Sequence, residues 1–442
     1  MKGQKSITLL ILFVALVAAT AQAQWSTATI SSARSTLAAT SAGNSAIFGG
    51  GIGMISIPPP ALDMYNYGTG TWTSGSISQG RTWIAAAATG NVAMFAGGAD
   101  DWILSVFNIV DQYNATSNVW TTNQLSDART RLAGAAYGSK ILFAGGMDAN
   151  MGVSYSKVDI YDTLSMAWTT ANLSQARYEL AGAAAAGKVV FAGGQNLNGV
   201  VFNTVDIYDV ATGTWSTDTL SQARYGLAAT ACGNKIYFAG GFDMANQVSK
   251  VIDIYDAAAN TWSVDSLSQA RGYLSAASMS GLVIFAGGSD NALASVFSTV
   301  DILDTTTATW NTDTLAIARC MGAATALGNK FIIAGGLEVT LFPTNTAEIY
   351  TVSSTGINQI NTNENVMSVS PNPAHDEVVV SLSHTGDFRI EVTDMMGKVV
   401  YSDRKNIQSG SYRFAVNDFP KGMYFVNVTD GVKNFAQKLL ID

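Results

Sequence analysis

The chain has 442 residues, of which 42 are glycine, 48% are hydrophobic and 13% are charged. Soluble domains usually carry about 25% charged residues, so this composition excludes an acidic disordered tail and a coiled coil. The net charge of −8 argues against nucleic acid as a partner, because phosphate binding requires a surplus of Lys and Arg on one face. Two cysteines are too few for a disulfide framework or a CxxC zinc site.

The first segment, residues 1–23, has the layout of a secretory signal peptide. Two lysines precede an apolar run at residues 7–19, and a small-x-small cleavage site ends at Ala23. The run is shorter than the roughly 20 apolar residues that a membrane-spanning helix requires. We therefore expect export of the chain, cleavage after Ala23, and no transmembrane segment in the mature protein.

Residues 24–352 repeat with a period of about 48 residues. Each unit is marked by a Gly-Gly pair, a tryptophan, and an arginine nine residues after the tryptophan. The glycine pairs begin at Gly50, Gly97, Gly145, Gly193, Gly240, Gly287 and Gly335. The arginines are Arg34, Arg81, Arg129, Arg177, Arg224, Arg271 and Arg319. The regular spacing indicates an array of similar structural units.

Each unit contains four short segments with the features of β-strands. In residues 180–219 an alanine-rich run precedes an apolar run that ends at the glycine pair. The alternating segment VDIYD follows, and the fourth segment begins at Trp215. Four strands in each of seven units predict a β-propeller. Small residues in the first strand suit the crowded centre of a propeller, and the tryptophan can pack between neighbouring blades.

These marks resemble those of kelch repeats, which combine a Gly-Gly doublet, a Tyr-Asp pair and a tryptophan at this spacing. The resemblance implies an all-β, seven-bladed kelch-like β-propeller over residues 24–352. Two units depart from the pattern, since Leu303 replaces a tyrosine and Asn66 replaces an aspartate. The last unit keeps residues 348–350 but lacks a following tryptophan. We expect residues 25–34 to supply its fourth strand and close the ring, which leaves no open sheet edge.

The predicted propeller contains no histidine, because His375 and His384 both follow it. This excludes Ser-His-Asp and Cys-His catalysis there, and also a histidine-ligated copper site like that of galactose oxidase, a kelch-type propeller enzyme. One carboxylate per unit is too sparse for calcium, which requires six to eight oxygen ligands. We expect no catalytic residue, no metal and no cofactor.

The repeated arginines are expected to pair with the repeated aspartates or with carbonyl groups. Cys232 and Cys320 are expected to be buried small residues.

The loops that follow the glycine pairs vary most from unit to unit. Apolar and aromatic residues in such loops can mark a binding surface. Two interpretations stay open: a face that binds a glycan or a protein, or solvated turns and the starts of the third strands. The candidate residues are Asp100, Asp101, Trp102, Asp148, Tyr155, Phe202, Asp243, Asp290 and Glu338.

The C-terminal part differs in composition. Residues 353–367 have the polar composition of a linker, and residues 368–442 have the alternating pattern of a small β-sandwich. Its motif residues are Pro371, Asn372, Pro373, Asp394, Gly397, Lys398, Gly422, Tyr424 and Lys438. In order and spacing they resemble the type A C-terminal sorting domain of the type IX secretion system. The resemblance implies that the type IX machinery is a partner and that the protein passes through the periplasm to the cell surface or the medium. An ordinary adhesion domain is the alternative.

These features together predict a secreted or cell-surface propeller that acts as a non-catalytic protein-binding, glycan-binding or scaffolding module. A carbohydrate-active enzyme that works without histidine is a competing hypothesis, and a structural surface component is a third. A central cluster of carboxylates would favour the enzyme, whereas a flat face of apolar loops would favour the binding module.

Overall fold

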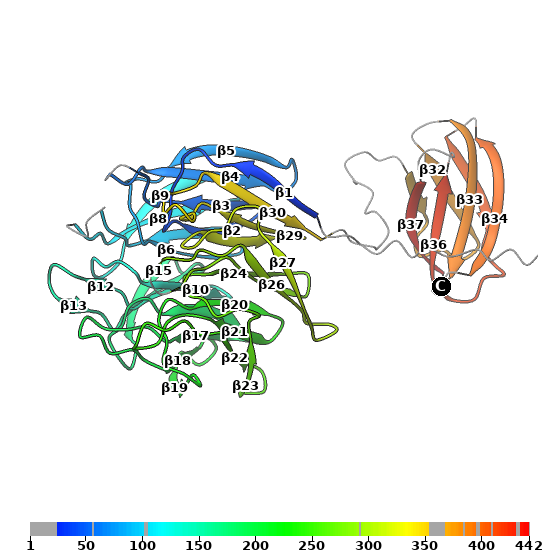
Figure 1. The fold of residues 1–442 in the computed structure, drawn as a ribbon. Coiled ribbons are helices and arrows are strands. Elements are labelled where there is room, and N and C mark those ends of the chain that lie inside the picture. The colour runs from blue at the N-terminus through cyan, green and yellow to red at the C-terminus, as the bar shows by residue number, and fades with distance from the viewer. Residues whose placement is uncertain are drawn as a thin grey trace, which may run out of the picture. The chain divides into compact units, whose positions relative to one another are not determined.

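The computed structural model describes residues 24–54, 57–100, 105–290, 293–352, 367–382, 385–394, 398–407, 410–429 and 434–441. The chain divides into two compact units, of which one comprises residues 21–353 and the other contains residues 354–442 (Figure 1). Every regular element in the described residues is a β-strand. A search of that part of the chain found no helix long and apolar enough to cross a membrane. The expected signal peptide, residues 1–23, lies outside the described residues.

The first unit, as far as it is described, holds seven antiparallel four-stranded sheets arranged as blades of a propeller (Figure 1). Blade one contains β2 (Ala38–Ala42), β3 (Ser45–Gly49), β4 (Ala61–Asn66) and β5 (Thr71–Ser76). Blade two contains β6 (Ala85–Thr89), β7 (Val92–Ala96), β8 (Ile109–Asn114) and β9 (Val119–Gln124). Blade three contains β10 (Ala133–Tyr137), β11 (Lys140–Ala144), β14 (Lys157–Asp162) and β15 (Ala167–Asn172). Blade four contains β16 (Ala181–Ala185), β17 (Lys188–Ala192), β18 (Thr204–Asp209) and β19 (Trp215–Thr219).

The remaining blades follow the same order of strands. Blade five contains β20 (Ala228–Cys232), β21 (Lys235–Ala239), β22 (Val251–Asp256) and β23 (Thr261–Ser266). Blade six contains β24 (Ser275–Met279), β25 (Leu282–Ala286), β26 (Thr299–Asp304) and β27 (Thr309–Thr314). Blade seven contains β28 (Ala323–Leu327), β29 (Lys330–Ala334), β30 (Thr346–Thr351) and, from the other end of the sequence, β1 (Gln24–Thr29). A short hairpin of β12 (Met147–Asp148) and β13 (Val153–Ser154) extends the loop of blade three. The expected four-strand unit is therefore confirmed.

The small residues of the repeat lie where the chain is most crowded. The alanine-rich first strands of successive blades are neighbours, as β10 is of both β6 and β16. The glycine pair is required by a close backbone approach between blades. Gly97 has a φ of +65°, and a Cβ atom there would lie 2.4 Å from the carbonyl oxygen of Arg129 in the next blade. The same carbonyl accepts the N–H of Gly98 at 3.0 Å, so the pair also bonds one blade to the next.

The repeated arginines form buried ion pairs, as expected. Arg129 has no exposed side-chain area and places its Nη2 2.5 Å from Asp159 Oδ2 and 3.0 Å from the carbonyl oxygen of Phe143. The second oxygen of Asp159 accepts the N–H of Ser126, which precedes the blade. Burial lowers the pKa of Arg129, and the charge of Asp159 opposes that shift. The other pairs are Arg34–Asp63, Arg81–Asp111, Arg177–Asp206, Arg224–Asp253, Arg271–Asp301 and Arg319–Glu348.

Ring closure by the N-terminal strand is confirmed. Strand β1 pairs with β30 in antiparallel register, with Trp25 opposite Tyr350 and their ring centroids 5.0 Å apart. The indole N–H of Trp25 donates to Asp313 of blade six at 2.8 Å. The N-terminal strand therefore joins blade seven and also contacts the preceding blade.

The two cysteines are both free. Cys320 is buried, and burial raises the pKa of its thiol to about 11. Cys232 was also expected to be buried, but it is partly exposed because it ends β20 beside a surface pocket.

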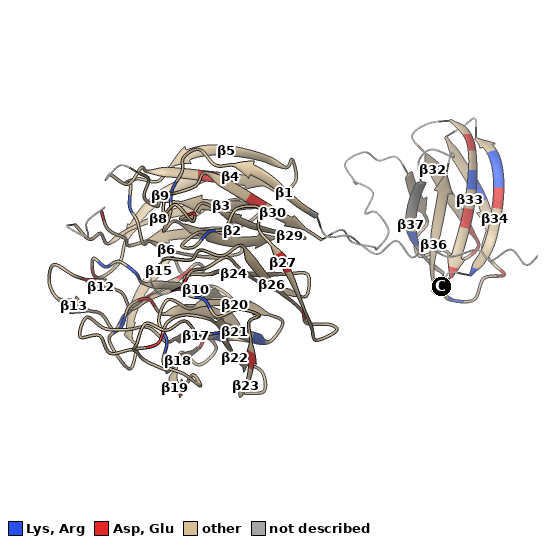
Figure 2. Cartoon of the chain, viewed as in Figure 1, with Lys and Arg blue, Asp and Glu red and all other residues tan. Residues whose placement is uncertain are grey.

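The second unit is built from two sheets. One contains β31 (Met367–Ser370), β32 (Glu377–Leu382) and β35 (Ser411–Ala415). The other contains β33 (Gly386–Asp394), β34 (Val399–Ile407), β36 (Gly422–Thr429) and β37 (Asn434–Ile441). Val378 and Phe414 of the first sheet share one apolar core with Ile390 and Val426 of the second, which is the arrangement of a sandwich. Charged residues of both signs lie along β33 and β34 (Figure 2). Of the expected linker, only Met367 is described, and it begins β31.

Candidate functional site

One position in the repeat changes its residue in every blade. It lies two residues after each buried arginine, and we call the seven residues the axial ring. They are Thr36, Trp83, Arg131, Glu179, Gly226, Tyr273 and Met321. All seven have a positive φ, between 51° and 62°. Only glycine adopts this conformation without cost, so six of these positions hold a locally unfavourable backbone.

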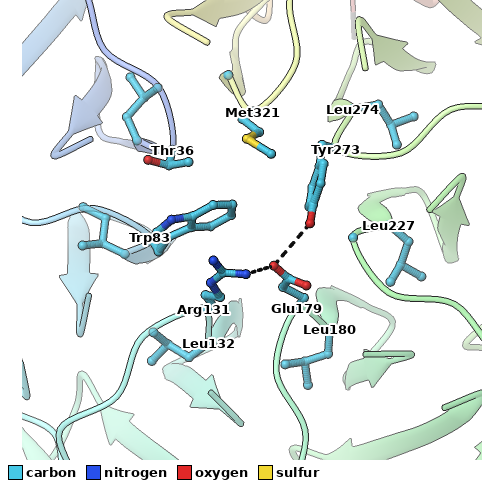
Figure 3. Close-up of a pocket in the computed structure, with 14 residues that line it drawn as sticks. Thr36, Trp83, Arg131, Leu132, Glu179, Leu180, Leu227, Tyr273, Leu274 and Met321 are labelled. Carbon is cyan, nitrogen blue, oxygen red and sulfur yellow. Dashed lines mark hydrogen bonds and ion pairs between the residues drawn. The ribbon is translucent and has the colours of Figure 1, made fainter. Parts of the chain in front are cut away.

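A belt of backbone hydrogen bonds maintains that conformation. The N–H of each axial-ring residue donates to the carbonyl oxygen of its equivalent in the preceding blade, at distances from 2.8 to 3.1 Å. The bond from Thr36 to Met321 closes the belt between the first and last blades. The side chains of the ring converge on the space at its centre (Figure 3).

The larger side chains of the axial ring bind one another (Figure 3). Glu179 forms an ion pair with Arg131 and accepts a 3.4 Å hydrogen bond from the hydroxyl of Tyr273. The other carboxylate oxygen of Glu179 accepts a 2.8 Å bond from Gln195. The guanidinium of Arg131 lies over the ring of Trp83, with Cζ 4.3 Å from the centroid. Trp83 and Tyr273 meet edge to face at 6.3 Å.

These residues line a cavity of about 200 Å³, which we call the axial pocket. Its remaining walls are the residues that directly follow the ring, such as Leu132 and Leu180. Pockets for drug-sized ligands usually measure about 300–1,000 Å³, so this one suits a smaller group.

The groups of the axial pocket are poorly suited to proton transfer. The side chain of Glu179 is 4% exposed, and both of its oxygens already accept hydrogen bonds. Burial and the charge of Glu179 raise the pKa of Tyr273 still further above neutrality than that of a free tyrosine, so this phenol does not give up its proton readily. Arg131 keeps a buried Nε that has no partner. The pocket therefore offers hydrogen-bond donors and aromatic surface, while its carboxylate is committed to neighbouring side chains.

The candidate loops surround the axial pocket on one face of the propeller. The residue after each glycine pair bridges to the residue after each repeated arginine, as Ala99 does to Thr82 and Gln195 to Tyr178. Among the loop acids, Asp148 accepts the N–H of Asn150 and Met151. Turn amides are bound in the same way by Asp243 and Asp290. Because these carboxylates act within their own turns, the structure gives each a local structural role.

The other candidate loop residues lie on the same face. Tyr155 and Phe202 are half-buried, and their backbone N–H groups donate to the carbonyl oxygens of Gly146 and Gly194, the second residues of their glycine pairs, at 2.8 Å. The backbone of Glu338 binds Leu341 and Phe342 within its loop, and the N–H of Asp100 donates to Ser105. Asp101 and Trp102 lie outside the described residues. In the described part of the chain, no group of three or more His, Cys, Asp or Glu side chains is placed to hold a metal ion.

The motif residues of the C-terminal unit hold its last strand and its turns. Asn372 lies between Pro371 and Pro373; its amide donates to the carbonyl of Lys438 at 2.7 Å and accepts from the N–H of Leu440 at 2.9 Å. Asp394 accepts the N–H of Lys398 in the turn after β33. The hydroxyl of Tyr424 donates to the carbonyl of Pro420, and Gly422 lies opposite Ile441 in the register of β36 and β37. Gly397 lies outside the described residues.

Sequence reasoning missed the axial ring. The usable signal was that the residue two places after each arginine differs in every unit, while the residue after it is Leu or Ile in six of the seven. All seven residues were missed because nothing in a single unit shows that they meet at the axis.

Comparisons with known proteins agree with this architecture. Residues 131–336 match the family model KLHDC2/KLHL20/DRC7 Kelch-repeats domain, and residues 368–442 match the Secretion system C-terminal sorting domain. A solved structure titled "Structure of YjhT" is similar over 62% of this chain and 96% of that chain, at 15% identity and a TM-score of 0.51. At this identity the likeness shows the fold alone.

A search of curated proteins found no match. The sorting domain indicates export to the cell surface or secretion, and it implies interaction with the type IX secretion machinery. The chain is a kelch-repeat β-propeller protein with a type IX C-terminal sorting domain.

Proposed function

We propose that the exported propeller is a non-catalytic binding module whose axial pocket receives the terminal sugar of a glycan. One observation carries the proposal. At the axial ring the residue differs in every blade. Four of the residues there bind one another and line a single cavity, namely Trp83, Arg131, Glu179 and Tyr273. Side chains with no role in the repeated fold have converged on one place, and that is typical of a ligand site.

The chemistry of the pocket favours a sugar over a charged group. The charges of Arg131 and Glu179 cancel within their ion pair, so the lining as a whole is neutral. A sugar hydroxyl both donates and accepts, and it can satisfy the unpartnered Nε of Arg131 as an acceptor. Trp83 and Tyr273 present apolar ring surface with a polar edge, which suits the faces of a sugar ring.

The same geometry argues against the competing carbohydrate-active enzyme. Glycoside hydrolysis generally uses two carboxyl groups, one as an acid and one as a base or nucleophile. Among the described residues that line the axial pocket, Glu179 is the sole carboxylate, and both of its oxygens are occupied. The tyrosine beside it has a raised pKa and cannot readily serve as a base.

A glycan array probed with the full chain tests the proposal. We expect saturable binding to a restricted set of glycans, with no release of sugar from those that bind. The Glu179→Gln variant keeps the size of the side chain but breaks the ion pair, and it should weaken binding. Hydrolysis of a bound glycan that is lost in Glu179→Gln would instead support the enzyme. Absence of saturable binding would support a structural surface component.

A further inference from the structure

A second cavity, of about 410 Å³, lies between blades five and six. Its lining includes Lys235 and Tyr237 of β21 together with Leu303 and Thr305 of blade six. Lys235 begins β21 at the hairpin turn, at the opposite end of that strand from Gly240. We call this cavity the lateral pocket, and it is distinct from the axial pocket.

The lateral pocket coincides with an exchange of side chains between blades. At the preceding interface, Val190 of β17 shares an apolar cluster with Tyr255 of the next blade. At the interface between blades five and six the large and the small side chain are exchanged. Tyr237 occupies the position of Val190, and Leu303 occupies the position of Tyr255. Both exchanged residues are buried, at 2% and 7% exposure. The phenol therefore comes from the neighbouring blade at this interface, and both exchanged residues line the lateral pocket.

The exchange removes a repeated aromatic contact. In the other six blades the third-strand tyrosine lies 4.9–5.4 Å from the tryptophan opposite it. In blade six the residue opposite Trp310 is Leu303. The hydroxyl of Tyr255 donates to Asn260 at 2.6 Å, whereas the equivalent of Asn260 in blade six is Ala308, which lines the lateral pocket. Blade six therefore lacks the hydroxyphenyl ring of the other blades, and it also lacks the asparagine acceptor that blades two and five provide for the hydroxyl.

An ion pair that joins neighbouring strands in blade four is not formed at this pocket among the described residues. In blade four, Lys188 of β17 forms an ion pair with Asp209, its partner in strand register. Lys235 and Asp256 hold the same register in blade five, but they form no ion pair in the described structure. One oxygen of Asp256 accepts two amides of the following turn, and the other oxygen accepts none of the bonds described. The pocket therefore contains a cationic donor and a carboxylate acceptor side by side in register.

We infer that the lateral pocket binds a small phenol-like molecule, an aromatic ring that carries a hydroxyl group. The ring would take the place of the missing tyrosine against Leu303 and Tyr237. A hydroxyl is the group that can accept from the ammonium of Lys235 and donate to the carboxylate of Asp256 at the same time. The inference does not depend on the function proposed for the axial pocket.

The test uses the full chain with p-cresol, which has the structure of a tyrosine side chain. Binding is measured by calorimetry and by the alkylation rate of Cys232, which lines the pocket. We expect p-cresol to bind and to slow alkylation of Cys232, while the buried Cys320 is unaffected. Toluene, which lacks the hydroxyl, should bind about tenfold more weakly, because it cannot make the polar contacts. Cyclohexanol, which lacks the planar ring, should also bind more weakly.

Two variants separate this inference from nonspecific binding. Tyr237→Val with Leu303→Tyr copies the Val190–Tyr255 interface and should fill the pocket, abolishing p-cresol binding. Lys235→Ala should weaken p-cresol binding without affecting toluene, whereas the matched Lys188→Ala should change neither. If the double variant fails to fold, the two lysine variants decide. Undetectable p-cresol binding by the unmodified chain, or equal binding by Lys235→Ala and Lys188→Ala, would overturn the inference.

Discussion

The backbone N–H of Thr36 donates to the carbonyl oxygen of Met321 across 2.8 Å, and this bond joins the first blade to the last at the axis. It completes the belt of seven such bonds. Because the belt uses only main-chain groups, it fixes the positive φ of the axial ring whichever side chain is present. The propeller can therefore vary its axial side chains without altering the fold that positions them.

Replacement of Met321 by glycine tests the cost of this backbone conformation. Glycine adopts a positive φ freely, so Met321→Gly should keep its stability or gain up to about 1 kcal/mol. Met321→Pro removes the donor and forces a negative φ, so it should destabilise the protein strongly. Urea unfolding followed by fluorescence measures both changes. A glycine variant that is several kcal/mol less stable would show that the side chain of Met321, not the belt, secures this site.

Loss of one buried arginine should be costly. Arg129→Met leaves the carboxylate of Asp159 buried without a cation, and we expect a loss of about 3–5 kcal/mol. Adding Asp159→Asn should restore part of the stability because it removes the stranded charge. The exposed pair of Arg413 and Glu377 is the control, and Arg413→Ala should cost at most about 1 kcal/mol. Equal effects of the two arginine variants would refute a structural role for the buried pairs.

Removal of the N-terminal strand should open the propeller. Deletion of residues 24–32 removes all of β1, leaving β30 as an unpaired edge and exposing the apolar face that Trp25 covers. Thermal unfolding should show a large fall in Tm. Asp313→Ala leaves β1 in place and removes the acceptor of the Trp25 indole and of the Thr314 N–H, so it should lower the Tm much less. An unchanged Tm after the deletion would contradict closure by β1.

Stability should decline in alkaline solution. Burial raises the pKa of Tyr237 to about 12, and burial with the charge of Glu179 raises the pKa of Tyr273. In the unfolded chain these phenols lose their protons near pH 10, so the unfolded state is favoured increasingly above that pH. The stability that is present below pH 10 should therefore be lost as the pH rises toward 12. In unfolding experiments the free energy of unfolding of Tyr237→Phe should fall less steeply above pH 10 than that of the unmodified chain. An unchanged slope of free energy against pH would refute the contribution of Tyr237 to this loss of stability.

The repeated parts of the fold could be predicted because each pattern occurs many times in the sequence. The spacing of Gly97, Trp120 and Arg129 recurs to within one residue in the other complete units, and the missing tryptophan of the last unit pointed directly to β1. The axial ring could not be predicted in this way. Its members are about 48 residues apart, and they meet only because of the belt and the positive φ.

The lateral pocket shows the same limit. The departure at Leu303 was visible in the sequence, but the compensating Tyr237 lies in another unit. Their contact depends on how neighbouring blades pack, which no single repeat contains. For the loop acids the sequence left a binding face and solvated turns as alternatives, and the structure shows that Asp148 and Asp243 accept hydrogen bonds within their own turns.

The most direct test of the account is a calorimetric titration of the full chain with an oligosaccharide identified on the glycan array. Arg131→Met removes the guanidinium of the axial pocket, and Asp243→Asn changes a loop carboxylate while keeping an acceptor for its turn. If the axial pocket is the binding site, Arg131→Met should weaken binding by about tenfold or more, and Asp243→Asn should leave it unchanged. The reverse result, with binding lost in the loop variant and retained in Arg131→Met, would contradict the account.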